Sequence, residues 1–219
     1  MTTFPRRIAT DTRYALMGFP ASVASFALTI TGVAAGLGSA VAFVGLPVLA
    51  GTAAMSRGFA DVERAALPGV LGHPVARPHY NQAPAQASWF RRTMNPLTSA
   101  QAWLDLLHPI IAFPFALIAF VFSVVWWAGA IAGLTFPLYG WILFDIPGMD
   151  GGLPSLLGLG DSLASFVGFN TGLGALFALT LLPVLRGAAL LKASLAQSLL
   201  TTAGEHTLTV PPRRIPAGV

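Results

Sequence analysis

The chain contains no cysteine and very few charged residues. The absence of cysteine excludes disulfides, thiolate metal sites and a cysteine nucleophile. Only 9% of the residues are charged, whereas 55% are hydrophobic and the mean hydropathy is +0.72. A chain of 219 residues with this composition has too few charges to cover a water-soluble globule. The composition therefore predicts an integral membrane protein.

Recognisable catalytic and ligand-binding motifs are also lacking. There is no Gly-rich phosphate loop, no nucleophile elbow, and no histidine with the helical spacing to a carboxylate that is typical of zinc sites. We therefore expect no catalytic residue, no cofactor and no metal site. A small lipid-processing enzyme would have only loop aspartates and histidines to use, such as Asp145 and His108.

The net charge of +4 comes from twelve Lys and Arg against eight Asp and Glu. Basic residues flanking apolar runs set the orientation of a membrane protein, so this excess needs no nucleic-acid partner to explain it. We accordingly expect membrane lipids and a protein as partners, and no nucleic acid.

The first long uncharged run covers residues 15–55, or 41 residues. It is far longer than the hydrophobic part of a signal peptide, so we do not expect cleavage within it. Since about 20 residues cross a bilayer, the run predicts two spans, at about 16–33 and 37–55. Gly32, Gly36 and Gly38 mark the expected turn between them, and Pro47 is an expected kink.

The second run, 106–144, has 39 residues without Asp, Glu, Lys or Arg. As one helix it would reach about 58 Å, roughly twice the hydrocarbon thickness of a bilayer. Either it forms two spans broken near 129–133, or it forms one span at 107–130 with an extension to 144. That extension would bend at Pro137 and lie at the interface, where its aromatic residues suit the headgroup zone.

The distribution of basic residues favours one crossing by the second run. With one crossing, all twelve Lys and Arg lie on the same side, whereas two crossings put four of them outside. The final span is then expected at 166–190, with 191–200 as a short amphipathic continuation. The sequence thus predicts an all-α integral membrane protein with one domain at 1–200. It has four transmembrane helices in two hairpins, both termini in the cytoplasm, and a short flexible tail at 201–219.

Glycines four residues apart occur at 32 and 36, at 129 and 133, and at 168 and 172. Such pairs let helices approach closely, and we expect them to pack within the bundle rather than between copies. A homo-oligomer is left open.

The segment after the second span, 56–67, has the pattern of a juxtamembrane amphipathic helix. Phe59, Val62 and Ala66 share one side, whereas Arg57, Asp61 and Arg64 share the other. We expect an ion pair between Arg57 and Asp61, a helix end at 68–69, and a position along the membrane surface or beneath the bundle. Residues 68–98 are expected to form a loop, closed by a capping box from Thr98 to Gln101.

The segment 145–165 is acidic and contains no Lys or Arg. Asp145, Asp150 and Asp161 could bind a hard cation or a cationic ligand weakly on the outside. The orientation rule accounts for the same charges without a ligand, and we prefer that interpretation.

Several short motifs together resemble a known family over residues 11–200. They are Asp11-Thr12-Arg13-Tyr14, Gly45-Leu46-Pro47, Arg57-Gly58-Phe59-Ala60, Glu63-Arg64, Pro78, Tyr80, Trp103-x-Asp105-Leu106 and Leu134-Thr135-x-Pro137-Leu138. The chain is similar to the sensor domain family of actinobacterial two-component systems, a four-span module of membrane histidine kinases that also occurs free-standing.

The resemblance implies a non-enzymatic sensor in the plasma membrane of a bacterium, which responds to a membrane or envelope signal. No phosphoacceptor motif follows the last span, and His206 is not part of one, so output would require a separate kinase or regulator. The alternative is an accessory or structural subunit of a transporter or another membrane complex. The expected coupling surface comprises Arg57, Phe59, Asp61, Glu63, Arg64, Tyr80, Trp103 and Asp105.

Overall fold

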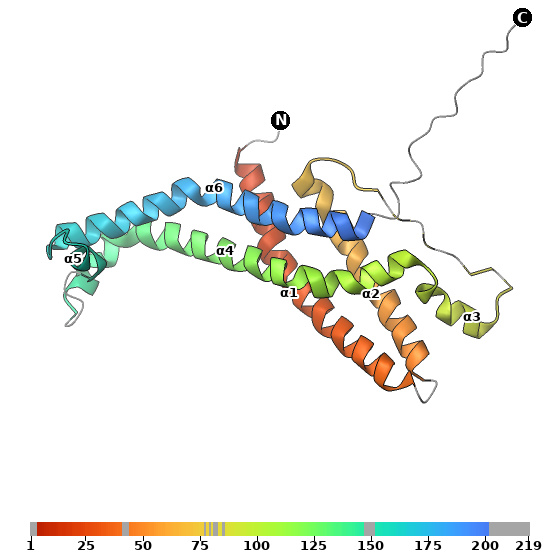
Figure 1. Ribbon diagram of the computed structural model, residues 1–219. Helices are drawn as coiled ribbons and strands as arrows, with labels where there is room; N and C mark the ends of the chain where they lie inside the picture. Colours follow the sequence, from red (N-terminus) through yellow and green to blue (C-terminus); the bar gives the residue numbers. More distant parts are fainter. Residues whose placement is uncertain are drawn as a thin grey trace, which may run out of the picture.

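The computed structural model describes residues 4–40, 44–76, 78, 80, 83–84, 86–146 and 152–201, and these contain helices but no strand. Figure 1 shows the elements in order. They are α1 (Phe4–Gly38), α2 (Gly45–Leu71), α3 (Trp89–Met94), the 3-10 helix η2 (Asn95–Leu97), α4 (Ala100–Phe144), α5 (Gly152–Leu156) and α6 (Leu163–Thr201). The expected all-helical class is therefore confirmed for the described residues.

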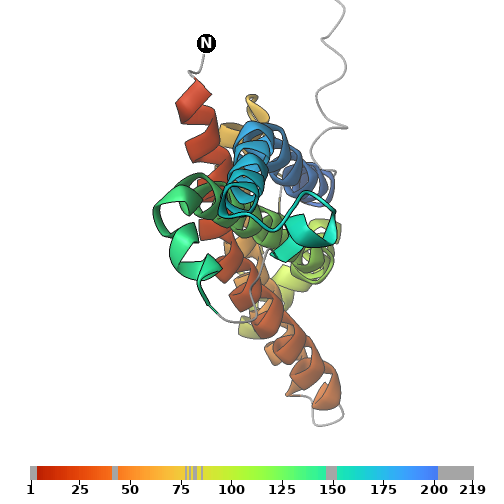
Figure 2. The same cartoon turned by 90° about the vertical axis from the view of Figure 1, so that its left-hand side faces the viewer.

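Two antiparallel hairpins build the molecule, one from α1 and α2 and one from α4 and α6. Figures 1 and 2 show α4 and α6 side by side, with the first hairpin crossing them at a steep angle. Among the residues that the structure describes, three segments are long and apolar enough to cross a membrane, namely Arg6–Gly38, Ala100–Phe144 and Leu163–Thr201. Helix α2 is not among them, because it begins at Gly45 and reaches Arg57 after twelve residues, or about 18 Å. The expected fourth span is thus not confirmed.

The turn begins after Gly38 rather than at Gly32 or Gly36, since α1 continues as a helix to Gly38. Gly32 and Gly36 instead let α1 approach α2. A Cβ atom on Gly32 would lie 2.3 Å from Oγ1 of Thr52, and one on Gly36 would lie 3.2 Å from the carbonyl oxygen of Gly45. These two glycines are therefore packing sites within the bundle rather than turn formers.

The two-span interpretation of 106–144 is also wrong, because α4 is one helix of 45 residues that includes Pro137. At the expected break, a Cβ atom on Gly133 would lie 2.3 Å from the Cα atom of Gly174 in α6. Beyond it, the ring centroids of Phe136 and Phe166 lie 5.3 Å apart. The segment 134–144 therefore packs against the first half of α6.

The expected juxtamembrane helix is not separate, since α2 continues through 56–67 and ends at Leu71. Gly72 adopts φ of 81°, a conformation favourable only for glycine, and donates its N–H to the carbonyl of Pro68. Val62, assigned to the apolar side, is 65% exposed, whereas Arg64 is buried beside Leu67. The buried side of α2 therefore carries a charged residue, which requires a partner.

The N-cap of α4 is Ser99 rather than Thr98. The Ser99 hydroxyl accepts a hydrogen bond from the N–H of Ala102 at 3.3 Å, whereas the Thr98 hydroxyl donates to the carbonyl of Asn95. Gln101 is thereby free to point into the bundle.

Helices α1 and α4 run in opposite directions where they touch. Phe19 stacks on Phe120 and Phe26 on Phe113, each with ring centroids 4.2 Å apart. Later residues of α1 thus meet earlier residues of α4. Four upright spans of alternating direction would make these helices parallel, so the two hairpins cannot both stand upright in a bilayer.

Burial divides the molecule into two parts. The hydrophobic core lies where α1, α2 and the end of α6 meet, and it comprises Tyr14, Ala60, Leu67, Val70, Ala189, Ala193, Ala196 and Leu200. Towards the far end of the second hairpin, large apolar residues such as Leu138 and Leu179 are 76% and 80% exposed. Lipid would cover such a surface, whereas the charged residues gather beside the core.

Candidate functional site: a buried polar network

The centre of the network is an ion pair between Arg64 of α2 and Asp105 of α4. Nη2 of Arg64 lies 2.6 Å from Oδ1 of Asp105, and both side chains are buried. Nη1 of Arg64 contacts Asp61 at 2.7 Å, and Nε donates to the carbonyl of Leu200 in α6. One guanidinium therefore joins α2, α4 and α6.

Asp105 accepts two further hydrogen bonds. The hydroxyl of Tyr80 donates to Oδ2 at 2.6 Å, and Nε2 of Gln101 donates to Oδ1 at 3.0 Å. Gln101 also donates to the carbonyl of Leu199 at 3.3 Å. The buried carboxylate is thus held by three side chains, as a buried charge requires.

The electrostatics of the network keep Arg64 charged. Burial lowers the pKa of Arg64, but Asp105, Tyr80 and Asp61 together more than offset this and raise the pKa above its ordinary value. Burial raises the pKa of Tyr80, and its hydrogen bond to Asp105 raises it further. Tyr80 therefore remains a proton donor to the carboxylate at neutral pH.

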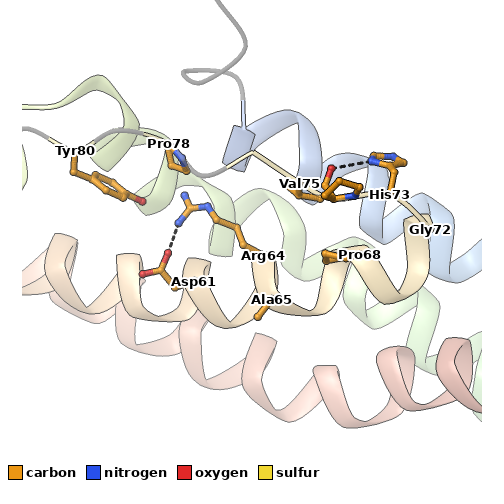
Figure 3. Close-up of a pocket in the computed structure, with 10 residues that line it drawn as sticks. Asp61, Arg64, Ala65, Pro68, Gly72, His73, Val75, Pro78 and Tyr80 are labelled. Atoms are coloured by element: carbon orange, nitrogen blue, oxygen red, sulfur yellow. Dashed lines mark hydrogen bonds and ion pairs between the residues drawn. The ribbon is translucent and has the colours of Figure 1, made fainter. Parts of the chain in front are cut away.

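Arg57 takes a different partner from the one expected. Its Cζ atom lies 3.5 Å from the ring centroid of Tyr80, a cation–π arrangement. Asp61 pairs with Arg64 three residues away, and the expected pair with Arg57 is not among the ion pairs of the described residues. Figure 3 shows Arg64 reaching from α2 to the loop, with Asp61 and Tyr80 beside it.

A second cluster joins α1, α2 and α6 through Glu63. Tyr14 donates its hydroxyl to Oε1 of Glu63, and Nζ of Lys192 lies 3.3 Å from the same oxygen. Lys192 is 2% exposed, and its Nζ lies 4.1 Å from the ring centroid of Tyr14. A Cβ atom on Gly18 would come within 2.8 Å of Nζ, so the glycine leaves room for the ammonium group.

A third contact fixes the start of α1 to α6. Nη1 of Arg186 donates to Asp11 at 3.1 Å and to the carbonyl of Val70 at 2.7 Å. All four long helices are thus connected by charged side chains at one end of the molecule.

A cavity of about 920 Å³ adjoins the central ion pair, between the end of α2 and the following loop (Figure 3). Asp61, Arg64, Tyr80 and His73 supply its polar lining, and Pro68 and Pro78 lie on its apolar side. Because the charged groups of this centre pair with each other, the arrangement suits holding the helices in register.

The residues expected at a coupling surface lie in three places. Arg57, Asp61, Arg64, Tyr80 and Asp105 come together, and Glu63 belongs to the second cluster. Phe59 and Trp103 lie outside both clusters. Phe59 is half-buried on α2, and Trp103 is 48% exposed on α4, although Asp105 two residues later is fully buried.

Sequence reasoning did not assign Gln101, Lys192, Tyr14, Asp11 and Arg186 to the site. The i, i+4 spacing of Gln101 and Asp105 could have assigned Gln101 to the site, because residues at this spacing are neighbours on a helix. Asp11 and Tyr14 stand in the motif before the first span. Their partners lie 175 and 49 residues away, and no local pattern identifies them.

The described aspartates of the acidic segment, Asp145 and Asp161, make none of the contacts given for the network. Asp145 follows the last residue of α4, Asp161 is exposed, and Asp150 lies outside the described residues. Among the residues that the structure describes, no group of three His, Cys, Asp or Glu could hold a metal ion.

Comparison with known proteins agrees with the resemblance noted from the sequence motifs. Searches of curated proteins and of solved structures found no match. The model of the family described as "Putative sensor" matches residues 14–200, which include α1 from Tyr14 onward, α2, α4 and nearly all of α6. The chain therefore belongs to this sensor family.

Proposed function

We propose that the protein is a non-enzymatic membrane sensor, which converts a membrane or envelope signal into a rearrangement of its helix ends. The observation that carries this proposal is the connection of α2, α4 and α6 by Arg64, Asp105 and the carbonyl of Leu200. A sensor requires two helix arrangements that the signal stabilises unequally. A shift of one helix in the lipid-facing part would have to change this shared set of contacts.

The energetics of buried ion pairs support a switching role for the network. Replacing such a pair by apolar residues is often neutral or stabilising, whereas breaking it by removing one partner is costly. A pair of this kind adds little to stability but demands a specific geometry. The ion pair therefore favours a few discrete arrangements of the helices over a continuous range of them.

The proposed output is contact with a separate kinase or regulator. Asp61 links the network to the surface, because its carboxylate bonds buried Arg64 while its side chain is 63% exposed. Trp103, 48% exposed, stands two residues before Asp105 on α4. A partner touching either residue would be sensitive to movement of the central pair.

We place the protein in a bacterial plasma membrane with both termini and the loop 72–98 in the cytoplasm. The twelve basic residues support this orientation, since all then lie on the inner side. This four-span arrangement requires α1 and α4 to cross in the same direction, so the hairpin of α1 and α2 has to reorient from the antiparallel contact that it makes with α4 in the structure.

The substitution Tyr80→Phe tests the sensing role. It keeps the ring beneath Arg57 but removes the hydrogen bond to buried Asp105, which contributes about 1.5–3 kcal/mol for a charged acceptor. Such a loss changes an equilibrium between two arrangements about ten- to hundredfold. We expect the association of the partner with the purified protein to lose its dependence on envelope stress, with membrane insertion unchanged.

Tyr139→Phe provides a matched control, because it removes a hydroxyl that bonds the carbonyl of Ala132 within the same helix α4. Co-purification from native membranes in mild detergent, before and after stress, provides the measurement. If both variants retain the stress dependence of the original chain, the network does not transmit the signal.

An accessory subunit of a transporter or another membrane complex is the second candidate. The observation that favours it is the open surface at Gly168 and Gly172, where an added Cβ atom would meet nothing within 4 Å. Another helix could approach closely there. A membrane partner present in constant ratio, whatever the stress and whether or not Tyr80 is changed, would support this role.

A further inference from the structure

The short helix α3 exposes aromatic side chains that nothing in the described part of the molecule covers. None of its six residues is buried, and Trp89 and Phe90 are 74% and 55% exposed. It begins at the N-cap Ser88, whose hydroxyl accepts the N–H of Arg91. A helix of this length has little stability of its own in water, so exposing two aromatic rings on it needs an explanation.

The residues of α3 separate into an apolar and a basic side. At 100° per residue, Trp89, Thr93, Phe90 and Met94 fall within an arc of about 140°, whereas Arg91 and Arg92 lie opposite. Aromatic residues on one side and arginines on the other are typical of helices that lie in the interface of a bilayer. The arginines would meet anionic headgroups while the rings enter the acyl boundary.

The position of α3 in the chain brings it to the expected membrane surface. Only residues 95–99 separate it from α4, and α3 contacts α2 and η2. On α4 an exposed apolar stripe begins near the start of the helix, with Leu107 and Ile111. These two residues lie four positions apart, so the lipid-facing surface of α4 starts close to where α3 is attached.

We propose that α3 is a membrane-surface anchor that binds anionic phospholipid, with Trp89 and Phe90 inserted and Arg91 and Arg92 at the phosphates. The anchor holds the segment before α4 against the bilayer that α4 crosses. This inference rests on the membrane placement of α4 and not on sensing. The labelling experiment below tests the anchor alone, whereas the Tyr80→Phe experiment tests sensing, so either proposal can fail without the other.

Site-directed spin labelling tests the anchor, and the absence of natural cysteine makes single labels straightforward. The intact protein is placed in lipid nanodiscs, one chain per disc, with or without phosphatidylglycerol. Phe90→Cys and Thr93→Cys report from the apolar side, and Thr93→Cys keeps both aromatic rings. Gln86→Cys, exposed in the preceding loop, provides the aqueous control.

We expect labels at 90 and 93 to be several-fold less accessible to a water-soluble nickel chelate than the label at 86, and more accessible to oxygen. The difference should grow with phosphatidylglycerol and lose this dependence in Arg91→Gln/Arg92→Gln. Equal nickel accessibility at 86, 90 and 93 in anionic discs would overturn the proposal. Protection at 90 and 93 from both reagents would also overturn it, because protein rather than lipid would then cover α3.

Discussion

At the scale of single residues, Arg64 shows how strongly burial changes the meaning of a charge. On the helical pattern it belongs to a solvated polar side, yet it is 6% exposed and bonded to Asp61, Asp105 and the carbonyl of Leu200. Exposed ion pairs contribute little to stability, whereas removing one member of a buried pair leaves an uncompensated charge.

The substitution Arg64→Met should therefore destabilise the protein by about 3–5 kcal/mol, because Asp105 loses its counter-charge in a buried site. Thermal or denaturant unfolding of the purified protein in nanodiscs measures this change. Asp61→Asn is the matched control and should cost less than about 1 kcal/mol, since Asp61 is largely exposed.

The double variant Arg64→Met/Asp105→Leu separates the charge from the packing. It removes both charges together, so we expect it to recover much of the lost stability. If Arg64→Met costs no more than Asp61→Asn, the charge of Asp105 is not held in the way that the contacts indicate.

At the scale of elements, the contact between α4 and α6 depends on two facing glycines. A Cβ atom on Gly174 would lie 2.4 Å from the carbonyl carbon of Gly133, so the backbones leave no room for a side chain. Gly172 lies on the same helix, but an added Cβ atom there meets nothing within 4 Å.

We expect Gly174→Ala to destabilise the second hairpin by about 1–3 kcal/mol through forced separation of the helices. Gly172→Ala should be neutral or slightly stabilising, because alanine favours helix. Unfolding of both variants under the same conditions checks the difference. Equal stability of the two would show that α4 and α6 do not approach each other at Gly133.

At the scale of the whole molecule, the relation between the two hairpins decides how the chain sits in the membrane. The uncharged run 15–55 is long enough for two crossings, but the structure leaves α2 only twelve residues before Arg57. The opposite directions of α1 and α4 where they touch also conflict with four upright spans. The proposed four-span topology can be examined at exposed positions between the helices.

Single cysteines replace Val44, Asp161 or Gln86, each of which is exposed in the structure. In intact cells a membrane-impermeant maleimide should label positions 44 and 161, while position 86 should react only after permeabilisation. Labelling at 161 but not 44 would show that only the hairpin of α4 and α6 crosses. Labelling at 86 alone would reverse the proposed orientation.

The sequence by itself determined the helical class, the apolar runs long enough to cross a membrane, and the motifs that identify the sensor family. Its charge distribution also favoured one crossing by 106–144 over two, and α4 is a single helix over that run. These properties follow from composition, the length of the apolar runs and the order of residues within short motifs, all of which depend on residues that are close in the sequence. The motifs also contain Arg57, Arg64, Tyr80 and Asp105, but the sequence predicted that these residues form a coupling surface rather than a buried network.

Only the tertiary structure decided that these residues form a buried network, that Gly32 and Gly36 pack rather than turn, and that α1 opposes α4. Each depends on contacts between residues far apart in the chain, such as Arg64 with the carbonyl of Leu200, 136 positions away. Local periodicity reports which side of a helix is apolar, and it does not report which side another helix covers. In a membrane protein, lipid accepts the apolar side, so the polar side is free to be buried.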